Sequence, residues 1–436
     1  MGRFPIAARV VDASVAFRDW PLAAPLLLST GAITSATAAE ATVVVRVDGC
    51  EAAGREAEGR GAVFLSELWA WPAADLPRAF RAARLQQLAQ RTAERLVELT
   101  GAEPQHPLEL GLRLLDQAAA GACDDEAPPA PRLARLLAAS PFDAALHDAV
   151  GKALDVSAYR LYDPPQPVPS ADAWFGVDGA AAAVGAMLRV EPQRVFPATF
   201  VVGPADGGEA LAELVRRWAV ERGYGRVKLK LRGVDPIEDA RRCCDVTAAL
   251  RAAGVAQPWI SVDMNGACPD MAAVATFLDE LARGDADAFA ALQYLEQPTA
   301  AGRTDVDWRG LRLAKPVLLD EGLEGLDSFV EAMERGWSGG ALKTCKGLSL
   351  MLVVAAWAMR HGRTLALQDL TNPGRAAVQA AWFAAHLPTV NGLELNSPQF
   401  VPAANEPWRS RRPELLDVHD GCHRLTGPVP AGLAEE

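Results

Sequence analysis

Short apolar runs alternate with longer amphipathic segments along the second half of the chain. The segments between the runs, such as residues 208–222 and 236–253, carry apolar residues at helical spacing. Strands that alternate with helices predict βα units in a parallel sheet, and eight such strands favour a closed α/β barrel over an open sheet. The expected strands are residues 196–202, 226–231, 258–263, 292–296, 316–320, 340–344, 363–368 and 391–396.

The first third of the chain has a different pattern. Residues 8–20 and 39–49 are expected to form strands, and residues 21–35, rich in small and apolar side chains, a loop between them. This pattern predicts a domain of strands and helices over about the first 155 residues. An irregular, proline-rich connection is expected over residues 159–195. Helical spacing occurs at residues 76–99, 107–120, 131–139 and 142–152.

Composition and charge limit the kinds of binding partner and the location that we expect for the protein. The net charge of −12, from 43 basic and 55 acidic residues, argues against nucleic acid or an anionic membrane as the main partner. The first residues lack the apolar core of a signal peptide, and the apolar run at residues 347–359 is too short to span a bilayer. The seven cysteines have no spacing typical of a zinc site. We therefore expect a soluble, cytoplasmic protein.

Two lysines share one face of the expected strand at residues 226–231. Side chains alternate along a strand, so Lys228 and Lys230 point the same way. Adjacent ammonium groups repel, which favours loss of a proton from one of them and makes a lysine usable as a base near neutral pH. For this motif alone, the alternative is a solvated edge strand with both lysines in water.

Acidic residues end three of the following strands. Asp263, Glu296 and the pair Asp320 and Glu321 are each about one βα unit apart, and Lys343 ends the next strand. In α/β barrels the carboxyl ends of the strands meet at one mouth. Converging carboxylates repel unless a cation joins them, and ligation by oxygen alone suits Mg²⁺. For each acid alone, the alternative is a carboxylate that caps the next helix.

Together these motifs resemble the enolase superfamily, in its mandelate racemase and muconate lactonizing enzyme branch. The resemblance implies an α/β fold, a modified TIM (β/α) barrel over residues 196–400 with an α+β N-terminal capping domain over residues 1–158. Residues 401–436 would pack back on the capping domain. The matching motifs are Lys228-Leu229-Lys230, Asp263-Met264-Asn265, Glu296-Gln297-Pro298, Asp320-Glu321, Lys343-Thr344-Cys345-Lys346-Gly347 and the helix at residues 142–152.

The resemblance also implies roles for these residues. Lys230 would be the general base on one face of the substrate, and Lys228 would lower the pKa of Lys230. Lys343 would be the acid or base on the opposite face, or a cation that stabilises the intermediate. The expected ligands of Mg²⁺, or alternatively Mn²⁺, are Asp263, Glu296 and Asp320. Supporting contacts to the ligands and lysines are expected from Asn265, Glu321 and Lys346.

Departures from the family pattern point to an uncommon substrate. The expected strand at residues 363–368 ends without the histidine of mandelate racemase, so Lys343 favours the two-lysine subgroup that includes muconate lactonizing enzyme. Glu394 and Asn396 stand where dipeptide epimerases carry two aspartates. Trp69 and Trp71 would either line a pocket or belong to the core. The substrate-binding residues we expect are Trp69, Trp71, Gln368, Asp369 and Asn396.

The resemblance implies abstraction of the proton α to a substrate carboxylate through an enediolate intermediate. We expect a racemase, epimerase or cycloisomerase that acts on a small carboxylate, in a homo-oligomer as is common among relatives. An acid-sugar dehydratase is the first alternative. A Schiff-base aldolase that uses one lysine as nucleophile, and a barrel that has lost catalysis, remain further alternatives.

Overall fold

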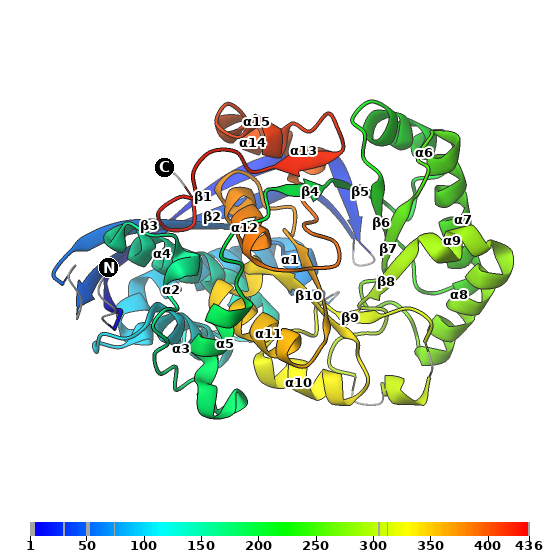
Figure 1. The fold of residues 1–436 in the computed structure, drawn as a ribbon. Helices are drawn as coiled ribbons and strands as arrows, with labels where there is room; N and C mark the ends of the chain where they lie inside the picture. Colours follow the sequence, from blue (N-terminus) through cyan, green and yellow to red (C-terminus); the bar gives the residue numbers. More distant parts are fainter. Residues whose placement is uncertain are drawn as a thin grey trace.

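The computed structural model describes residues 5–28, 31–48, 53–73, 75–303, 306–311 and 313–434. Within this part of the chain, an antiparallel sheet with helices at the N-terminus packs against a curled parallel sheet with helices around it (Figure 1). One continuous hydrophobic core cluster contains residues of both units. No helix within these ranges is both long enough and apolar enough to cross a membrane.

The N-terminal sheet has three antiparallel strands in the order β1-β2-β3, which are β1 Ala7–Leu28, β2 Gly31–Asp48 and β3 Glu56–Phe64. The prediction of a loop over residues 21–35 is wrong, because β1 and β2 continue as a hairpin in which Leu26 pairs with Ile33. A register shift between Pro21 and Leu26 accommodates the prolines on an edge strand. Residues 29 and 30 of the predicted loop lie outside the described residues.

The pattern of the sequence does not predict β3, because its centre has glycines where a strand normally has β-branched residues. These glycines allow close contact with helix α4 (Arg132–Leu154). A Cβ atom on Gly61 would lie 2.0 Å from the carbonyl oxygen of Pro141, and one on Gly59 would lie 2.1 Å from that of Ala145. The prediction of two helices at residues 131–139 and 142–152 is wrong, since α4 continues through Pro141 while packed on β3.

We expect Gly61→Ala to lower the free energy of unfolding by about 1–3 kcal/mol, because the added methyl group meets backbone of α4 that cannot move independently. Denaturant unfolding of the purified variant measures this change. Gly310→Ala is the matched control, since nothing lies within 4 Å of a Cβ atom at that position. Equal unfolding midpoints for Gly61→Ala and the wild type would contradict the close packing of β3 on α4.

Seven parallel strands form the curled sheet, in the order β11-β10-β9-β8-β7-β6-β5. The helices α6 to α9 lie outside β5 to β8 (Figure 1). The strands are β5 Thr199–Val202, β6 Arg226–Lys230, β7 Trp259–Asp263, β8 Leu292–Glu296, β9 Val317–Leu319, β10 Gly339–Lys343 and β11 Thr364–Gln368. The outer helices are α6 Gly208–Val215, α7 Pro236–Ala252, α8 Met271–Gly284, α9 Ala286–Ala291, α10 Leu326–Glu334, α11 Leu348–Arg360 and α12 Arg375–His386.

The prediction of an eighth strand at residues 391–396 is wrong. This segment touches β11 through a single bridge between Gln368 and Glu394. The side-chain amide of Asn391 accepts from the backbone N–H of Leu367 and donates to its carbonyl, both at 2.9 Å, so a side chain replaces part of the ladder. At the other edge of the sheet, the side-chain amide of Gln399 accepts from the backbone N–H of Val201 in β5 and donates to the carbonyl of the same residue.

The remaining segments tie the two units together. The predicted strand at 196–202 is divided: β4 Val195–Pro197 pairs with β12 Cys422–Arg424, and β5 joins the barrel. The connection at residues 159–195 contains a helix, α5 Gly179–Met187, which packs on α11. Near the C-terminus, Leu433 N donates to Asp148 of α4. The other helices are α1 Glu67–Ala70, α2 Arg78–Thr100, α3 Pro107–Ala119, α13 Ser397–Phe400, α14 Pro402–Arg409 and α15 Pro413–Leu416.

A buried polar contact joins α4 of the N-terminal domain to α11 of the barrel. Asp143 accepts from the backbone N–H of Ser349 at 2.8 Å and from its hydroxyl at 2.6 Å, so it caps the start of α11 from another domain. Burial lowers the pKa of His147 to about 3, and its Nε2 lies 2.8 Å from the Ser349 hydroxyl. The hydroxyl proton of Ser349 is directed at Asp143, so this cluster holds two domains together and presents no nucleophile.

Candidate active site

Three carboxylates stand at the ends of neighbouring barrel strands. Asp263 is the last residue of β7, Glu296 is the last residue of β8, and Asp320 follows β9 directly. Each is fully buried, and one oxygen of each lies within 4.8 Å of the others. The three acids converge as their spacing in the sequence predicts, because parallel neighbours in register bring their carboxyl ends together.

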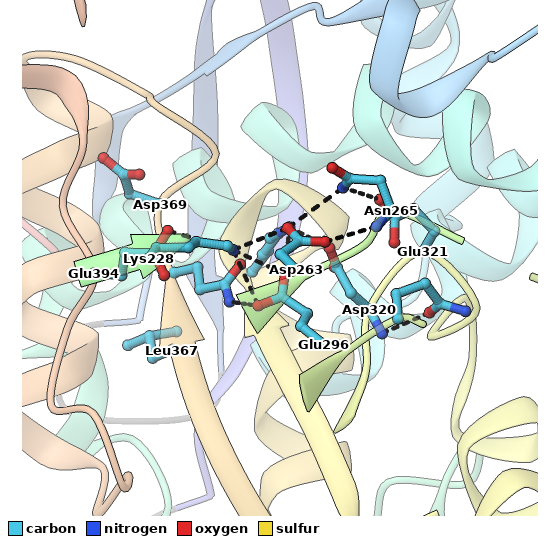
Figure 2. A network of polar contacts seen from close by, with 12 residues as sticks. Lys228, Asp263, Asn265, Glu296, Asp320, Glu321, Leu367, Asp369 and Glu394 are labelled. Carbon is cyan, nitrogen blue, oxygen red and sulfur yellow. Dashed lines mark hydrogen bonds and ion pairs between the residues drawn. The ribbon is translucent and has the colours of Figure 1, made fainter. Parts of the chain in front are cut away.

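The paired lysines of β6 enter this cluster from one side. Lys228 donates to both oxygens of Glu296, at 2.9 and 3.0 Å, and lies 3.2 Å from Asp263 and 3.4 Å from Glu394. Lys230 donates to Asp263 and, at 3.1 Å, to Asn265. Figure 2 shows Lys228 between Glu394 and Asp263, with Glu296 beneath them. Both lysines are buried, which rules out the solvated edge strand.

Two further lysines reach the cluster from the other side. Lys343, the last residue of β10, donates to Asp320 and lies 3.7 Å from Glu296. Lys346 donates to the backbone carbonyl and the carboxylate of Asp320. Lys230 and Lys343 therefore contact different carboxylates, one on β7 and one after β9. This arrangement places an amine on either side of the acidic cluster.

The electrostatics favour the charged form of Lys228, Lys343 and Asp320, whereas burial outweighs the nearby lysines at Glu296 and raises its pKa well above the usual value. Burial lowers the pKa of Lys228, but Glu296, Glu394 and Asp263 outweigh burial and hold that pKa well above its usual value. For Lys343, Asp320 and Glu296 likewise outweigh burial and raise the pKa. Burial raises the pKa of Asp320, yet the nearby lysines, with Lys343 first, bring it below its usual range.

The donor set fits a divalent cation such as Mg²⁺. Opposite oxygens around Mg²⁺ are roughly 4 Å apart, close to the span of these carboxylates. A second observation is a surplus of acid beside them: Oε2 of Glu321 is buried without a hydrogen-bond partner, while its Oε1 accepts from Asn265 at 2.9 Å. Burial, with the negative charge of Asp320, raises the pKa of Glu321 to about 7. An added cation would offset this surplus.

A cavity of about 650 Å³, counting open solvent at its mouth, lies over the lysines. Trp69 of α1 lines it, with its ring centroid 4.9 Å from Nζ of Lys343. Trp71 does not line this cavity; its ring packs against Phe80 at a centroid distance of 6.2 Å. Trp71, which directly follows α1, belongs to the hydrophobic core cluster, so of the two alternatives left open by the sequence the core position describes it.

Of the three binding residues predicted at and beyond the end of β11, two line the cavity and one does not. Gln368 and Asn396 line the cavity, and their amide nitrogens donate to Glu296 and Glu394 respectively. Asp369 does not line it, which corrects the prediction, and its carboxylate points away from Asp263 and Glu296 in Figure 2. Asp369 accepts from the backbone of Thr371 at 2.8 Å and thereby stabilises a left-handed turn.

Sequence reasoning missed two residues that support the cluster. Glu394 contacts Lys228, and the signal was available, because it is an acid in the last expected strand segment. Gln297 follows Glu296 directly, and its side-chain oxygen accepts from the backbone N–H groups of Asp320 and Gly322 at 2.8 and 3.1 Å. No pattern in the sequence indicates this contact, since it joins the loops after two different strands.

Comparisons with known proteins agree with this architecture. The model of the family described as Enolase C-terminal domain-like matches residues 210–431, more than half of the chain. A search of curated protein sequences finds no match.

Solved structures of this superfamily share the fold at low sequence identity. Muconate lactonizing enzyme from Pseudomonas fluorescens, complexed with muconolactone, is 17% identical with a TM-score of 0.55, and the match covers 86% of this chain and 83% of that one. Dipeptide epimerase from Enterococcus faecalis, complexed with Mg and L-Leu-L-Tyr, is 14% identical with a TM-score of 0.63, covering 98% and 99%. An enolase from Bradyrhizobium, complexed with magnesium and mandelic acid, is 18% identical with a TM-score of 0.60, covering 98% and 96%. The family match, the capped α/β barrel and the strand-end acids together establish that this chain belongs to the enolase superfamily.

Proposed function

We propose that the protein is a Mg²⁺-dependent enzyme that abstracts the proton α to a substrate carboxylate, of the racemase, epimerase or cycloisomerase type. The observation that carries this proposal is the pair Lys230 and Lys343, which contact a buried cluster of three carboxylates from different sides and both line one cavity. Two amines on opposite sides can act on the two faces of one carbon atom.

The position of each residue in the site determines its proposed role. Asp263, Glu296 and Asp320 would hold the ion, and bound Mg²⁺ would supply positive charge for the oxygens of the substrate carboxylate. Lys230 would remove the α proton on one face, and Lys343 would return a proton on the other, or stabilise the enediolate by its charge. Trp69 covers Lys343 from the capping side and excludes water from it.

This proposal places the chain in the mandelate racemase and muconate lactonizing enzyme branch, in its two-lysine subgroup. We also propose that the enzyme acts in the cytoplasm, as a homo-oligomer, with Mn²⁺ able to replace Mg²⁺. The Schiff-base alternative uses one lysine as nucleophile and gives the three converging carboxylates no role, whereas a Mg²⁺-dependent reaction would use all three. Borohydride trapping of a covalent adduct with substrate would favour that alternative instead.

Incubation of a library of carboxylates with the protein in deuterated water and Mg²⁺ tests the function. We expect deuterium to appear at the carbon α to the carboxylate of at least one compound, by NMR, and the exchange to stop when a chelator removes the metal. Readdition of Mg²⁺ should restore the exchange. Exchange that persists in excess chelator, or no exchange across acid sugars, acylated amino acids and lactones, would contradict the proposal.

A further inference from the structure

The part of the cavity lining that comes from the N-terminal sheet is apolar and uncharged. Leu26 and Ile33 pair directly across the β1–β2 hairpin, so both side chains lie on one face, and both line the cavity. Phe64 at the end of β3 extends this apolar wall, and Val201 of β5, the register neighbour of Lys228, adds an apolar side chain beside the floor. In Figure 1 the hairpin crosses from the capping domain to the barrel mouth beside β5.

The charged residues of the cavity are confined to its floor. Lys228, Lys230, Lys343 and Glu394 line it, and each contacts another charged group of the acidic cluster. The hairpin offers nothing comparable, because the sequence from Trp20 to Ala39 contains no Asp, Glu, Lys or Arg. Among the described residues that line the cavity, a ligand tail that leaves the floor therefore meets no side chain able to form an ion pair with it.

Hydroxyl-rich ligands are also poorly matched. Outside the floor, Ser66 and Thr371 are the hydroxyl side chains among the described residues that line the cavity, along with the indole of Trp69. Ser66 Oγ and the indole nitrogen of Trp69 are buried without a hydrogen-bond partner among the described residues, so each could pair with a hydroxyl of the ligand. Every further hydroxyl of a polyhydroxylated chain that loses its bonds to water without replacement costs about 1–3 kcal/mol, or roughly tenfold in affinity. An alkyl or aryl tail gains from the same transfer.

We propose that the substrate is a carboxylate whose tail is uncharged and apolar, packed between the Leu26–Ile33 face of the hairpin and the Phe64 side of the cavity. This inference rests on the proposed function for the orientation of the carboxylate toward the floor. It disfavours acid sugars and ligands with a second charge.

Binding of simple carboxylates to the Mg²⁺-loaded protein tests the tail directly, without turnover. Butyrate, hexanoate and octanoate should bind with a Kd that falls about fourfold for each added methylene, measured by calorimetry. Gluconate, which carries hydroxyls along the same six-carbon chain as hexanoate, and adipate, which adds a second carboxylate to it, should each bind at least tenfold more weakly than hexanoate. Equal or tighter binding of gluconate or adipate, no dependence on chain length, or no binding of any of these acids would overturn the inference.

Variants of the hairpin show which face is responsible. Leu26→Asp should remove the dependence on chain length, and Leu26→Arg should reverse the preference between adipate and hexanoate, a gain that misfolding cannot produce. Leu27→Asp is the control, since adjacent residues of a strand face opposite sides and Leu27 does not line the cavity. Both Leu26 variants binding like the wild type would contradict the proposed wall.

These measurements separate the two proposals. If the catalytic proposal alone is wrong, the alkyl carboxylates still bind according to tail length, but no compound of the deuterium-exchange library is labelled. If the tail proposal alone is wrong, deuterium exchange occurs, and it is as fast for carboxylates with charged or hydroxylated tails as for those with apolar tails.

Discussion

Glu296→Gln is expected to reduce Mg²⁺-dependent α-proton exchange by at least about 10³-fold, and to lower the free energy of unfolding by about 3–5 kcal/mol. Glu296 is fully buried and accepts from Lys228 through both oxygens. Removing its charge takes one ligand from the cation and leaves Lys228 with less compensation in a buried site. The exchange rate as a function of Mg²⁺ concentration, together with denaturant unfolding, measures both effects.

Glu331→Gln is the control for this substitution. Glu331 lies on α10 with 61% of its side chain exposed and pairs only with Arg335, so its loss should change stability by less than about 0.5 kcal/mol. Exchange should be unaffected. If Glu296→Gln retained the exchange rate and the Mg²⁺ dependence of the wild type, the cation would not be held at the ends of β7, β8 and β9.

Lys230→Ala and Lys343→Ala are each expected to slow exchange on one stereochemical face by about 10²–10⁴-fold. The reason is geometric: Lys230 contacts Asp263 and Lys343 contacts Asp320, so the two amines would reach a bound substrate from different sides. Substrates of each α configuration, followed separately by NMR, distinguish the two faces. Loss with one variant only would favour an elimination or cycloisomerisation that uses a single base over racemisation.

Lys315→Ala is the matched lysine control. Lys315 precedes β9, at the end of the barrel away from the cavity, and its ammonium group lies over the ring of Phe289. Its replacement should leave exchange on both faces unchanged. Full exchange in both the Lys230 and the Lys343 variants would show that other groups move the proton.

The strand-end acids and lysines could be predicted because local chemistry places them. An apolar run that ends in Asp263, Glu296 or Asp320 indicates a buried strand with a charge at its carboxyl end. The parallel register of neighbouring strands then brings these charged ends together. The same reasoning could have identified Glu394. The contacts made by Gln297 were not, since they depend on two loops that meet only in the folded barrel.

The hairpin shows why other parts escaped prediction. Pro21, Pro25 and Gly31 are typical of a loop, yet the segment is extended because its two strands pair and its apolar side chains pack against the end of β3 and the C-terminal segment. Residues 391–396 have the pattern of a strand, but the amide of Asn391 occupies backbone groups of Leu367 that a strand would have used. In both cases contacts distant in sequence outweigh local propensity.

The amino-acid sequence by itself determined the alternation of strands and helices from β5 to β11 and the chemical groups at the strand ends, since hydrophobic periodicity is a local property of the chain. Only the tertiary structure decided which of two nearby tryptophans reaches the cavity, that Asp369 supports a turn instead of lining the site, and that an uncharged hairpin lines the same cavity as the lysines. Those outcomes depend on which surfaces pack together, and the free energy of that packing is shared among residues far apart in the sequence.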